Sequence, residues 1–187
     1  MLISQFQTVG RDLCNQGLVS SHGGNLSIRL GERLFITHRG SMLGHLKEQD
    51  LVETGINKND RYTPLASTEL TVHRSIYKQT SALAVVHAHP AYAVALSFVE
   101  HEIVPCNVEG GVLLSKVPVI GWGMKVKPGE LAEEIAEALE KHKIVLVRGH
   151  GSFAIGQLLE EAYQYTTTLE ESCHLLYLLK SLGIDPT

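Results

Sequence analysis

Hydrophobic positions recur along the chain with two different periods, and these predict a mixture of helices and strands. Leu2, Phe6, Val9 and Leu13 recur at helical spacing, and Gly17 is a suitable stop. Apolar stripes predict further helices at residues 67–80, 127–142 and 158–182, and Pro90 favours the start of another at 91–99. Alternating or continuous apolar runs predict strands at residues 25–30, 33–37, 51–54, 83–89, 117–122, 143–150 and 152–156.

The order of these elements indicates the fold class. Strands and helices mix without a strict strand–helix–strand rhythm, which favours an α/β domain with a mixed sheet over a doubly wound fold. A chain of 187 residues lies within the usual size of one domain, so we expect residues 1–187 to form a single domain. In the helix at 67–80, Leu70, His73, Ile76 and Tyr77 share one face, and Ser67 or Thr68 is the expected N-cap. In the last helix the expected apolar stripe consists of Leu158, Ala162, Tyr165, Leu169, Leu176 and Leu179.

Composition narrows the functional classes. With 16 Lys and Arg against 20 Asp and Glu, the net charge is −4, which argues against a nucleic-acid or anionic-membrane binder. Three widely spaced cysteines without a C-x-x-C pair indicate neither a disulfide framework nor a cysteine zinc site. No leader segment or membrane-spanning run is present, so we expect a cytoplasmic protein without a membrane partner.

Three histidines lie at the expected ends of apolar strands. His87 and His89 are two residues apart in "LAVVHAH", a spacing that directs both side chains to the same face of a strand. His150 ends the later run "KIVLVRGH" and has glycine on either side. Three neutral imidazoles with one open position are typical of catalytic zinc, although each short motif alone also arises by chance.

Glu69 and two glycine-containing segments are candidates for the remaining chemistry. Glu69 is expected in the first turn of a helix, where it either caps the helix or acts as a general base. The segment "SHGGNLS" at 21–27 either binds an anion or merely leads into a hairpin. It lacks the lysine and spacing of a P-loop and the pattern of a dinucleotide-binding turn.

Five separated motifs together resemble one protein family. "SHGGNLS", "FITHRGS", "STEL" with a following histidine, "VVHAHP" and "VLVRGHGSFAIG" with "LEEAY" occur in the order typical of class II aldolase/adducin proteins. The resemblance spans the chain from the first helix to the last. It implies a largely antiparallel mixed sheet flanked by helices, Zn²⁺ held by His87, His89 and His150, and Glu69 as the catalytic acid/base.

The resemblance also implies a substrate and an assembly. The expected enzyme is an aldehyde-lyase that cleaves or forms a small sugar phosphate of the L-fuculose-1-phosphate type. The products of cleavage would be dihydroxyacetone phosphate and an aldehyde, reached through an enediolate. A homotetramer with active sites between subunits is implied as well. The residues expected to hold the substrate phosphate are Asn25, Arg39, Gly40, Ser67 and Thr68.

Two departures from the family pattern leave alternatives open. The family's phosphate loop usually reads T-P-T-G, whereas Arg39 in this chain can bind either a phosphate or a carboxylate. Where the fuculose-phosphate enzymes place a tyrosine acid, this chain has Gly121 and Trp122, and an indole N–H is only a hydrogen-bond donor. His22 is one hypothetical substitute. An epimerase or a dehydratase of the same family, or a non-catalytic adducin-like module, is the alternative function.

Overall fold

One mixed sheet organises the protein. The computed structural model describes residues 2–122 and 128–184, and within them eight strands form a sheet of order β3-β2-β1-β4-β8-β7-β6-β5. The strands are β1 (Asn25–Leu30), β2 (Arg33–Thr37), β3 (Leu51–Gly55), β4 (Ala84–Ala88), β5 (Glu102–Ile103), β6 (Val117–Ile120), β7 (Ile144–Val147) and β8 (Gly151–Gly156). Strands β6 and β7 pair in parallel, and the other neighbouring strands pair antiparallel.

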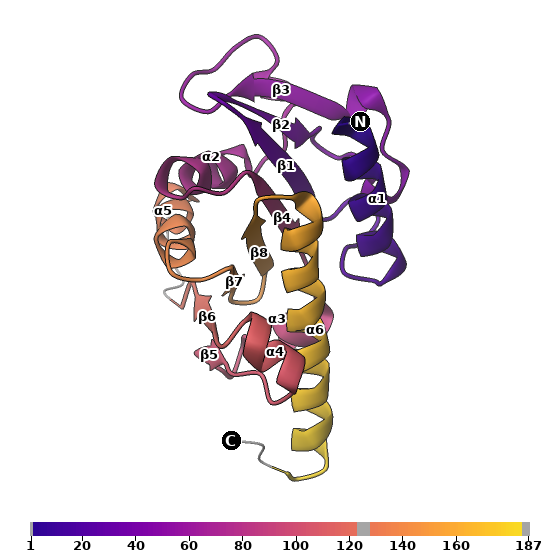
Figure 1. Cartoon of the computed structure of the whole chain (residues 1–187), viewed down its shortest axis with the longest axis vertical. Helices are drawn as coiled ribbons and strands as arrows, with labels where there is room; N and C mark the ends of the chain where they lie inside the picture. Colours follow the sequence, from indigo (N-terminus) through magenta and orange to yellow (C-terminus); the bar gives the residue numbers. More distant parts are fainter. Residues whose placement is uncertain (1, 123–127, 185–187) are drawn as a thin grey trace.

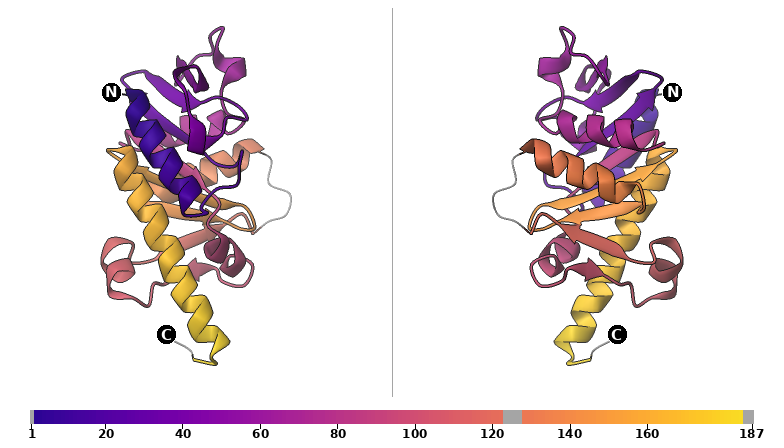
Figure 2. Two further views of the ribbon diagram at one scale, coloured as in Figure 1. Left: turned by 90° about the vertical axis from the view of Figure 1, so that its right-hand side faces the viewer. Right: turned by 90° about the vertical axis from the view of Figure 1, so that its left-hand side faces the viewer.

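Helices cover both faces of this sheet. They are α1 (Leu2–Asn15), α2 (Leu70–Gln79), α3 (Ala91–Leu96), α4 (Val108–Leu113), α5 (Pro128–Leu139) and α6 (Leu159–Ser181), with 3₁₀ turns at Leu43–His45, Glu48–Asp50 and Thr63–Leu65. Helices α1 and α6 lie on one face, and α2 and α5 lie on the other (Figures 1 and 2). The prediction of an α/β fold with a mostly antiparallel mixed sheet flanked by helices is therefore confirmed. The limits of the domain, residues 1–187, stay a prediction.

Two hydrophobic cores lie on opposite faces of the sheet, and strand β4 contributes to both. Val86 packs with the core beneath α1 and α6, whereas Val85 packs with the core beneath α2 and α5. Successive side chains of a strand point to opposite faces, so a strand covered on both sides has a continuous apolar sequence. The same alternation places His87 on the α2/α5 face, where its ring stacks on Phe153 of β8.

Several expected element boundaries differ from the observed ones. Helix α2 begins at Leu70, and Glu69 occupies the N-cap position without a capping hydrogen bond, so the N-cap prediction of Ser67 or Thr68 was wrong. The backbone N–H of Ser67 donates to Thr37 O at 3.1 Å, which keeps this segment extended beside β2. Strand β7 ends at Val147, so His150 lies in the β7–β8 turn rather than at the end of a strand.

The ends of other predicted elements also differ. Helix α3 stops at Leu96 rather than at residue 99, and strand β6 stops at Ile120 rather than at residue 122. Strand β4 stops at Ala88, because the N–H of His89 donates to Leu18 O instead of continuing the ladder. Leu158 was expected on the buried stripe of α6, but it is the N-cap and is 59% exposed. The predicted helix at 127–142 is α5, and its expected first residue lies outside the described residues. Strand β5 and helix α4 were not predicted. No helix among the described residues has the length and apolarity required to span a membrane.

Candidate active site

One cleft brings together all nine residues that the sequence singled out. Its volume is about 230 Å³, and its lining consists of His22, Gly23, Gly24, Asn25, His38, Arg39, Gly40, Ser41, Ser67, Thr68, Glu69, His87, His89 and His150. The sheet explains this convergence. Asn25 at the start of β1 pairs with His87 near the end of β4, and Ala88 pairs with Ser152 at the start of β8. Antiparallel neighbours therefore bring three chain segments together at the same end of three central strands.

The three histidines form a compact cluster of nitrogen atoms. Their nearest ring nitrogens lie within 4.8 Å of one another, and Nε2 of His87 is 3.0 Å from Nε2 of His89. His87 is 1% exposed, whereas the side chain of His150 is 41% exposed in its turn. Nδ1 of His87 donates to the carbonyl oxygen of Ser152 at 2.9 Å, so Nε2 carries the lone pair that faces the cluster.

This donor set fits a small divalent cation. Burial lowers the pKa of His87 well below the ordinary value, and burial together with the charge of His150 lowers the pKa of His89. Neutral imidazoles are the form that binds a metal. Nε2 of His87 also faces the Oε2 atom of Glu69 at 3.1 Å, where a neutral ring offers no proton. A bound cation would satisfy these facing lone pairs, and three nitrogen ligands with an open position match a catalytic zinc site.

Glu69 directs its carboxylate into the histidine cluster. Its Oε1 lies 3.3 Å from Nε2 of His150, and its Oε2 accepts a hydrogen bond of 2.7 Å from Nδ2 of Asn25. Burial raises the pKa of Glu69, although the Asn25 hydrogen bond and the charge of His150 act in the opposite direction. A carboxylate that is partly desolvated yet still open to the cleft has the properties of a general base.

The residues expected to hold phosphate line the same cleft. Gly40 has a φ of +72°, which only glycine adopts without strain, and it follows Arg39, whose guanidinium donates to Pro64 O at 3.0 Å. Ser67 is buried and accepts a bond of 3.3 Å from the N–H of Glu69, whereas Thr68 is exposed. Asn25 differs from the expectation, because its amide is bonded on both sides within the protein.

The glycine loop before β1 has a packing role that the sequence did not reveal. A Cβ atom on Gly23 would lie 2.9 Å from Nδ1 of His89, and one on Gly24 would lie 2.7 Å from the carbonyl oxygen of His87. Only glycine lets this loop approach the two histidines so closely. His38 and Ser41 also line the cleft and were not singled out, although they belong to the same "THRGS" segment as Arg39 and Gly40.

Trp122 lies apart from the described lining of the cleft. Its ring stacks on His101 at a centroid distance of 3.8 Å and contacts the guanidinium of Arg148 at 4.6 Å. Its Nε1 donates to Val119 O at 3.0 Å. The indole therefore packs beside β6 and makes its contacts outside the cleft.

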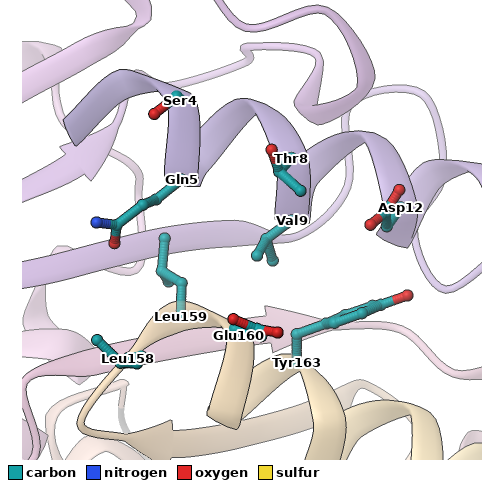
Figure 3. A pocket seen from close by; sticks show the side chains of 9 residues that line it. All are labelled: Ser4, Gln5, Thr8, Val9, Asp12, Leu158, Leu159, Glu160 and Tyr163. Carbon is teal, nitrogen blue, oxygen red and sulfur yellow. The ribbon is translucent and has the colours of Figure 1, made fainter. Parts of the chain in front are cut away.

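A larger cavity, of about 420 Å³, lies between α1 and the start of α6 (Figure 3). Val9, Leu158 and Leu159 give it an apolar wall, and Asp12 and Glu160 add carboxylates at its rim. The hydroxyl of Tyr163 already accepts a hydrogen bond from Gln16. None of the nine described residues that line this cavity is a histidine or a cysteine. Although the cavity is larger than the histidine cleft, these residues therefore offer no nitrogen or sulfur ligands for a metal.

Comparison with known proteins gives a consistent result. Residues 4–177 match the model of the class II aldolase and adducin N-terminal domain. The chain is 30% identical to an L-fuculose phosphate aldolase of Methanococcus maripaludis, over 97% of this chain and 99% of that protein. It is 29% identical to a 3-oxo-tetronate 4-phosphate decarboxylase of Pectobacterium atrosepticum, over 91% of this chain and 81% of that protein. The crystal structure of L-fuculose-1-phosphate aldolase from Thermus thermophilus superposes with a TM-score of 0.88 at 40% identity, covering 98% of this chain and 97% of that one.

Proposed function

Because the chain belongs to the class II aldolase and adducin family, we propose that it is a metal-dependent aldolase acting on a small sugar phosphate. The reaction cleaves or forms a carbon–carbon bond. Dihydroxyacetone phosphate and an aldehyde are the products of cleavage and the substrates of bond formation. One observation carries the proposal: the carboxylate of Glu69 and the nitrogens of three histidines meet in a single cleft. A scaffold protein gains nothing from a buried His87 whose lone pair faces a carboxylate, which argues against the non-catalytic alternative.

We assign the metal to His87, His89 and His150, with Zn²⁺ as the expected ion. When bound, the metal supplies Lewis acidity to the carbonyl and hydroxyl oxygens of the ketose. The protein fixes the ligand geometry through the hydrogen bond from His87 to Ser152 O and the stacking of His87 on Phe153.

Glu69 is the proposed base that removes the carbon-bound proton of the ketose. Partial burial in the cleft raises its pKa and so makes it a stronger base than an exposed carboxylate. The N–H of Asn25 stabilises its ionised form, which keeps it ready to accept a proton. In the direction of cleavage the same carboxyl group returns the proton to the carbon atom.

The substrate phosphate is proposed to lie between Arg39, Gly40, Ser67 and Thr68, together with the side-chain N–H of Asn25 that does not face Glu69. Backbone N–H groups, hydroxyls and a guanidinium are typical phosphate ligands, and these residues line the same cleft as the three histidines. Arg39 already has one hydrogen bond to a backbone carbonyl, which holds its side chain along the rim. We further propose that the protein is cytoplasmic, in keeping with the proposed action on a small sugar phosphate.

A homotetramer with active sites between subunits is also proposed. From the end of α3 through α4, several apolar side chains are exposed, namely Phe98, Val99, Val104, Val108 and Val112. The ring of Phe98 lies beside Gly149, the neighbour of the proposed ligand His150. An interface that covers these residues would therefore reach the edge of the cleft. Light scattering on the purified protein tests this state directly.

A decarboxylase is the second candidate, and the position of Trp122 favours it. Loss of carbon dioxide from a 3-oxo acid needs an electrophilic metal but no acid that protonates an aldehyde oxygen. The segment that carries this acid in fuculose-phosphate aldolases contributes Trp122, whose indole is held against His101. Arg39 would then serve a carboxylate or a phosphate equally well. A relative of this chain is itself named as such a decarboxylase.

The two candidates are separated by supplying both substrates to the same zinc-loaded protein. Release of dihydroxyacetone phosphate from L-fuculose 1-phosphate, abolished by a chelator and restored by zinc, is the result that the aldolase proposal predicts. Release of carbon dioxide from a 3-oxo-tetronate 4-phosphate, with no cleavage of the sugar phosphate, would replace it with the decarboxylase. Neither reaction, with zinc shown to be bound, would refute both.

A further inference from the structure

A chain of four hydrogen bonds runs from the core beneath α2 to the carboxylate of Glu69. Its bonds are Tyr77 OH to Ser27 Oγ (2.7 Å), Ser27 Oγ to His73 Nδ1 (2.6 Å), His73 Nε2 to Asn25 Oδ1 (2.5 Å) and Asn25 Nδ2 to Glu69 Oε2 (2.7 Å). Two residues come from β1 with strand spacing, and two come from α2 with helical spacing. Each pair thus points to a common face, and the two faces meet between β1 and α2.

The interior of this chain is closed to solvent. Ser27 and His73 have no exposed surface, Tyr77 is 1% exposed and Asn25 is 6% exposed. Burial lowers the pKa of His73 to about 3, so its imidazole is neutral and carries a single N–H. Every hydrogen bond therefore has to be assigned with one proton on that ring.

Ionised Glu69 leaves only one direction for these bonds. A carboxylate can only accept, so Asn25 presents its Nδ2 group to Glu69 and its Oδ1 atom to His73. His73 must then donate from Nε2, and its Nδ1 accepts from the hydroxyl of Ser27. The oxygen of Ser27 in turn accepts from the hydroxyl of Tyr77.

The opposite direction is unfavourable at its buried end. It would require Glu69 to donate a proton to Asn25, and every later bond would reverse in turn. Within the part of the chain that the structure describes, Ser27 Oγ is the one hydrogen-bond partner of the Tyr77 hydroxyl. Reversal would leave that buried O–H without an acceptor, which is costly in a protein interior. Tyr77 therefore favours the direction that offers an N–H to Glu69.

We propose that His73 is a positioning residue for the reaction: it fixes the amide of Asn25 so that its N–H faces the carboxylate of Glu69. This inference rests on the proposed role of Glu69 as the base. His73 itself does not line the cleft, and among the described residues its ring nitrogens bond only to Ser27 and Asn25, so it reaches Glu69 through Asn25. In the sequence, His73 is a member of the buried face of a helix and the histidine that follows "STEL" in the family motif, and neither feature assigns it a role.

The protonated nitrogen of His73 is tested first, because it does not depend on activity. Nitrogen-15 NMR of the full-length protein distinguishes a neutral ring protonated at Nε2 from one protonated at Nδ1 and from a charged ring. The signal is assigned by its loss in a His73→Gln variant. A neutral ring with its proton on Nε2 at neutral pH is expected. A ring protonated at Nδ1, or at both nitrogens, would overturn the proposal.

Kinetics of three variants test the consequence for the reaction. His73→Leu removes both bonds at similar volume, whereas His73→Gln keeps one donor and one acceptor. Ile76→Ala is the matched control, because Ile76 is fully buried on the same helix but outside the hydrogen-bond chain. The assay is zinc-dependent exchange of a carbon-bound proton of dihydroxyacetone phosphate for deuterium.

His73→Leu is expected to lower the maximal exchange rate about tenfold, the usual effect of losing a hydrogen-bonded supporting residue, with zinc content unchanged. KM should stay within about twofold, because substrate contacts are intact. His73→Gln should recover most of the rate, and Ile76→Ala should lose stability but not exchange. A His73→Leu variant that exchanges like Ile76→Ala refutes the role of His73 alone. Absence of exchange in the parent protein refutes the proposed function instead.

Discussion

Replacement of Gly151 by alanine should damage the candidate metal site. Gly151 begins β8, directly after His150, and a Cβ atom there would lie 2.3 Å from the carbonyl oxygen of Ala88 and 2.7 Å from Cδ2 of His89. Real Cβ atoms do not approach within 3 Å, so β4 and the β7–β8 turn must separate by roughly 1 Å in a closely packed interior. Zinc ligands tolerate errors of only about 0.2 Å.

The expected magnitudes follow from this displacement. Overpacking typically costs about 1–3 kcal/mol, which corresponds to a decrease in Tm of between about 2 and 12 °C for a chain of this size. Zinc affinity should fall by about 10- to 100-fold, the usual effect of disturbing the surroundings of metal ligands. Thermal unfolding in the presence of a chelator gives the first quantity, and competition with a zinc indicator gives the second.

Gly111→Ala is the matched control for this experiment. Gly111 lies inside α4, no atom lies within 4 Å of its virtual Cβ, and alanine is favoured over glycine in a helix by about 1 kcal/mol. Its Tm should stay constant or rise, with unchanged zinc affinity. A Gly151→Ala variant that behaves like Gly111→Ala would show that the turn does not approach β4 as closely as described.

Three further predictions follow from the site. His87→Ala should lose bound zinc and activity together, measured by elemental analysis and turnover of the same sample, and a variant that keeps its zinc would refute this ligand assignment. Arg39→Ala should raise KM for a phosphorylated ketose about tenfold with little change in kcat, because charge-assisted hydrogen bonds contribute about 1.5–3 kcal/mol to binding. The control is Arg61→Ala, since Arg61 is exposed and packs on Tyr62. Equal KM values in the two variants would contradict the assignment of Arg39. The free energy of unfolding should fall as pH decreases from 6.5, because the unfolded chain takes up a proton on His73 while the folded chain, where burial lowers that pKa to about 3, does not. The stabilisation from neutral His73 is complete above pH 6.5. It decreases by about 1.4 kcal/mol for each pH unit between pH 6.5 and about 3. Urea unfolding of His73→Gln should show a slope smaller by that amount, and an unchanged slope would mean that His73 is not buried in its neutral form.

The strongly periodic parts of the fold were predictable from the sequence. The face of α2 formed by Leu70, His73, Ile76 and Tyr77 is buried as expected. Residues at spacing i, i+3 and i+4 lie on one side of a helix, and that side packs against the core. Strand β5 has two residues and α4 has six, with Val108 and Val112 exposed. Such short elements have too few positions to show a period, and the neighbouring segments determine their conformation.

The residues of the candidate site could be predicted from the sequence, but the hydrogen bonds between them could not. The spacing of His87 and His89 and the position of His150 indicated a candidate metal site, the resemblance to a family implied the same ligands, and the observed cleft brings these residues together. The hydrogen bond between His73 and Asn25 joins residues 48 positions apart, and it depends on how α2 packs against β1. No local pattern encodes that alignment. The sequence therefore places His73 on an apolar helix face after "STEL", but it does not show the partner of its ring.

The central claim is that Glu69 removes a carbon-bound proton beside a bound metal, and proton exchange tests it most directly. The zinc-loaded protein is mixed with dihydroxyacetone phosphate in deuterated water, and proton NMR follows the hydroxymethyl signal. The account predicts stereospecific loss of one C–H proton in the parent protein and none in a Glu69→Gln variant that still binds zinc. Equal exchange in both proteins would contradict the role of Glu69. No exchange in either, with zinc bound, would show that dihydroxyacetone phosphate is not the donor.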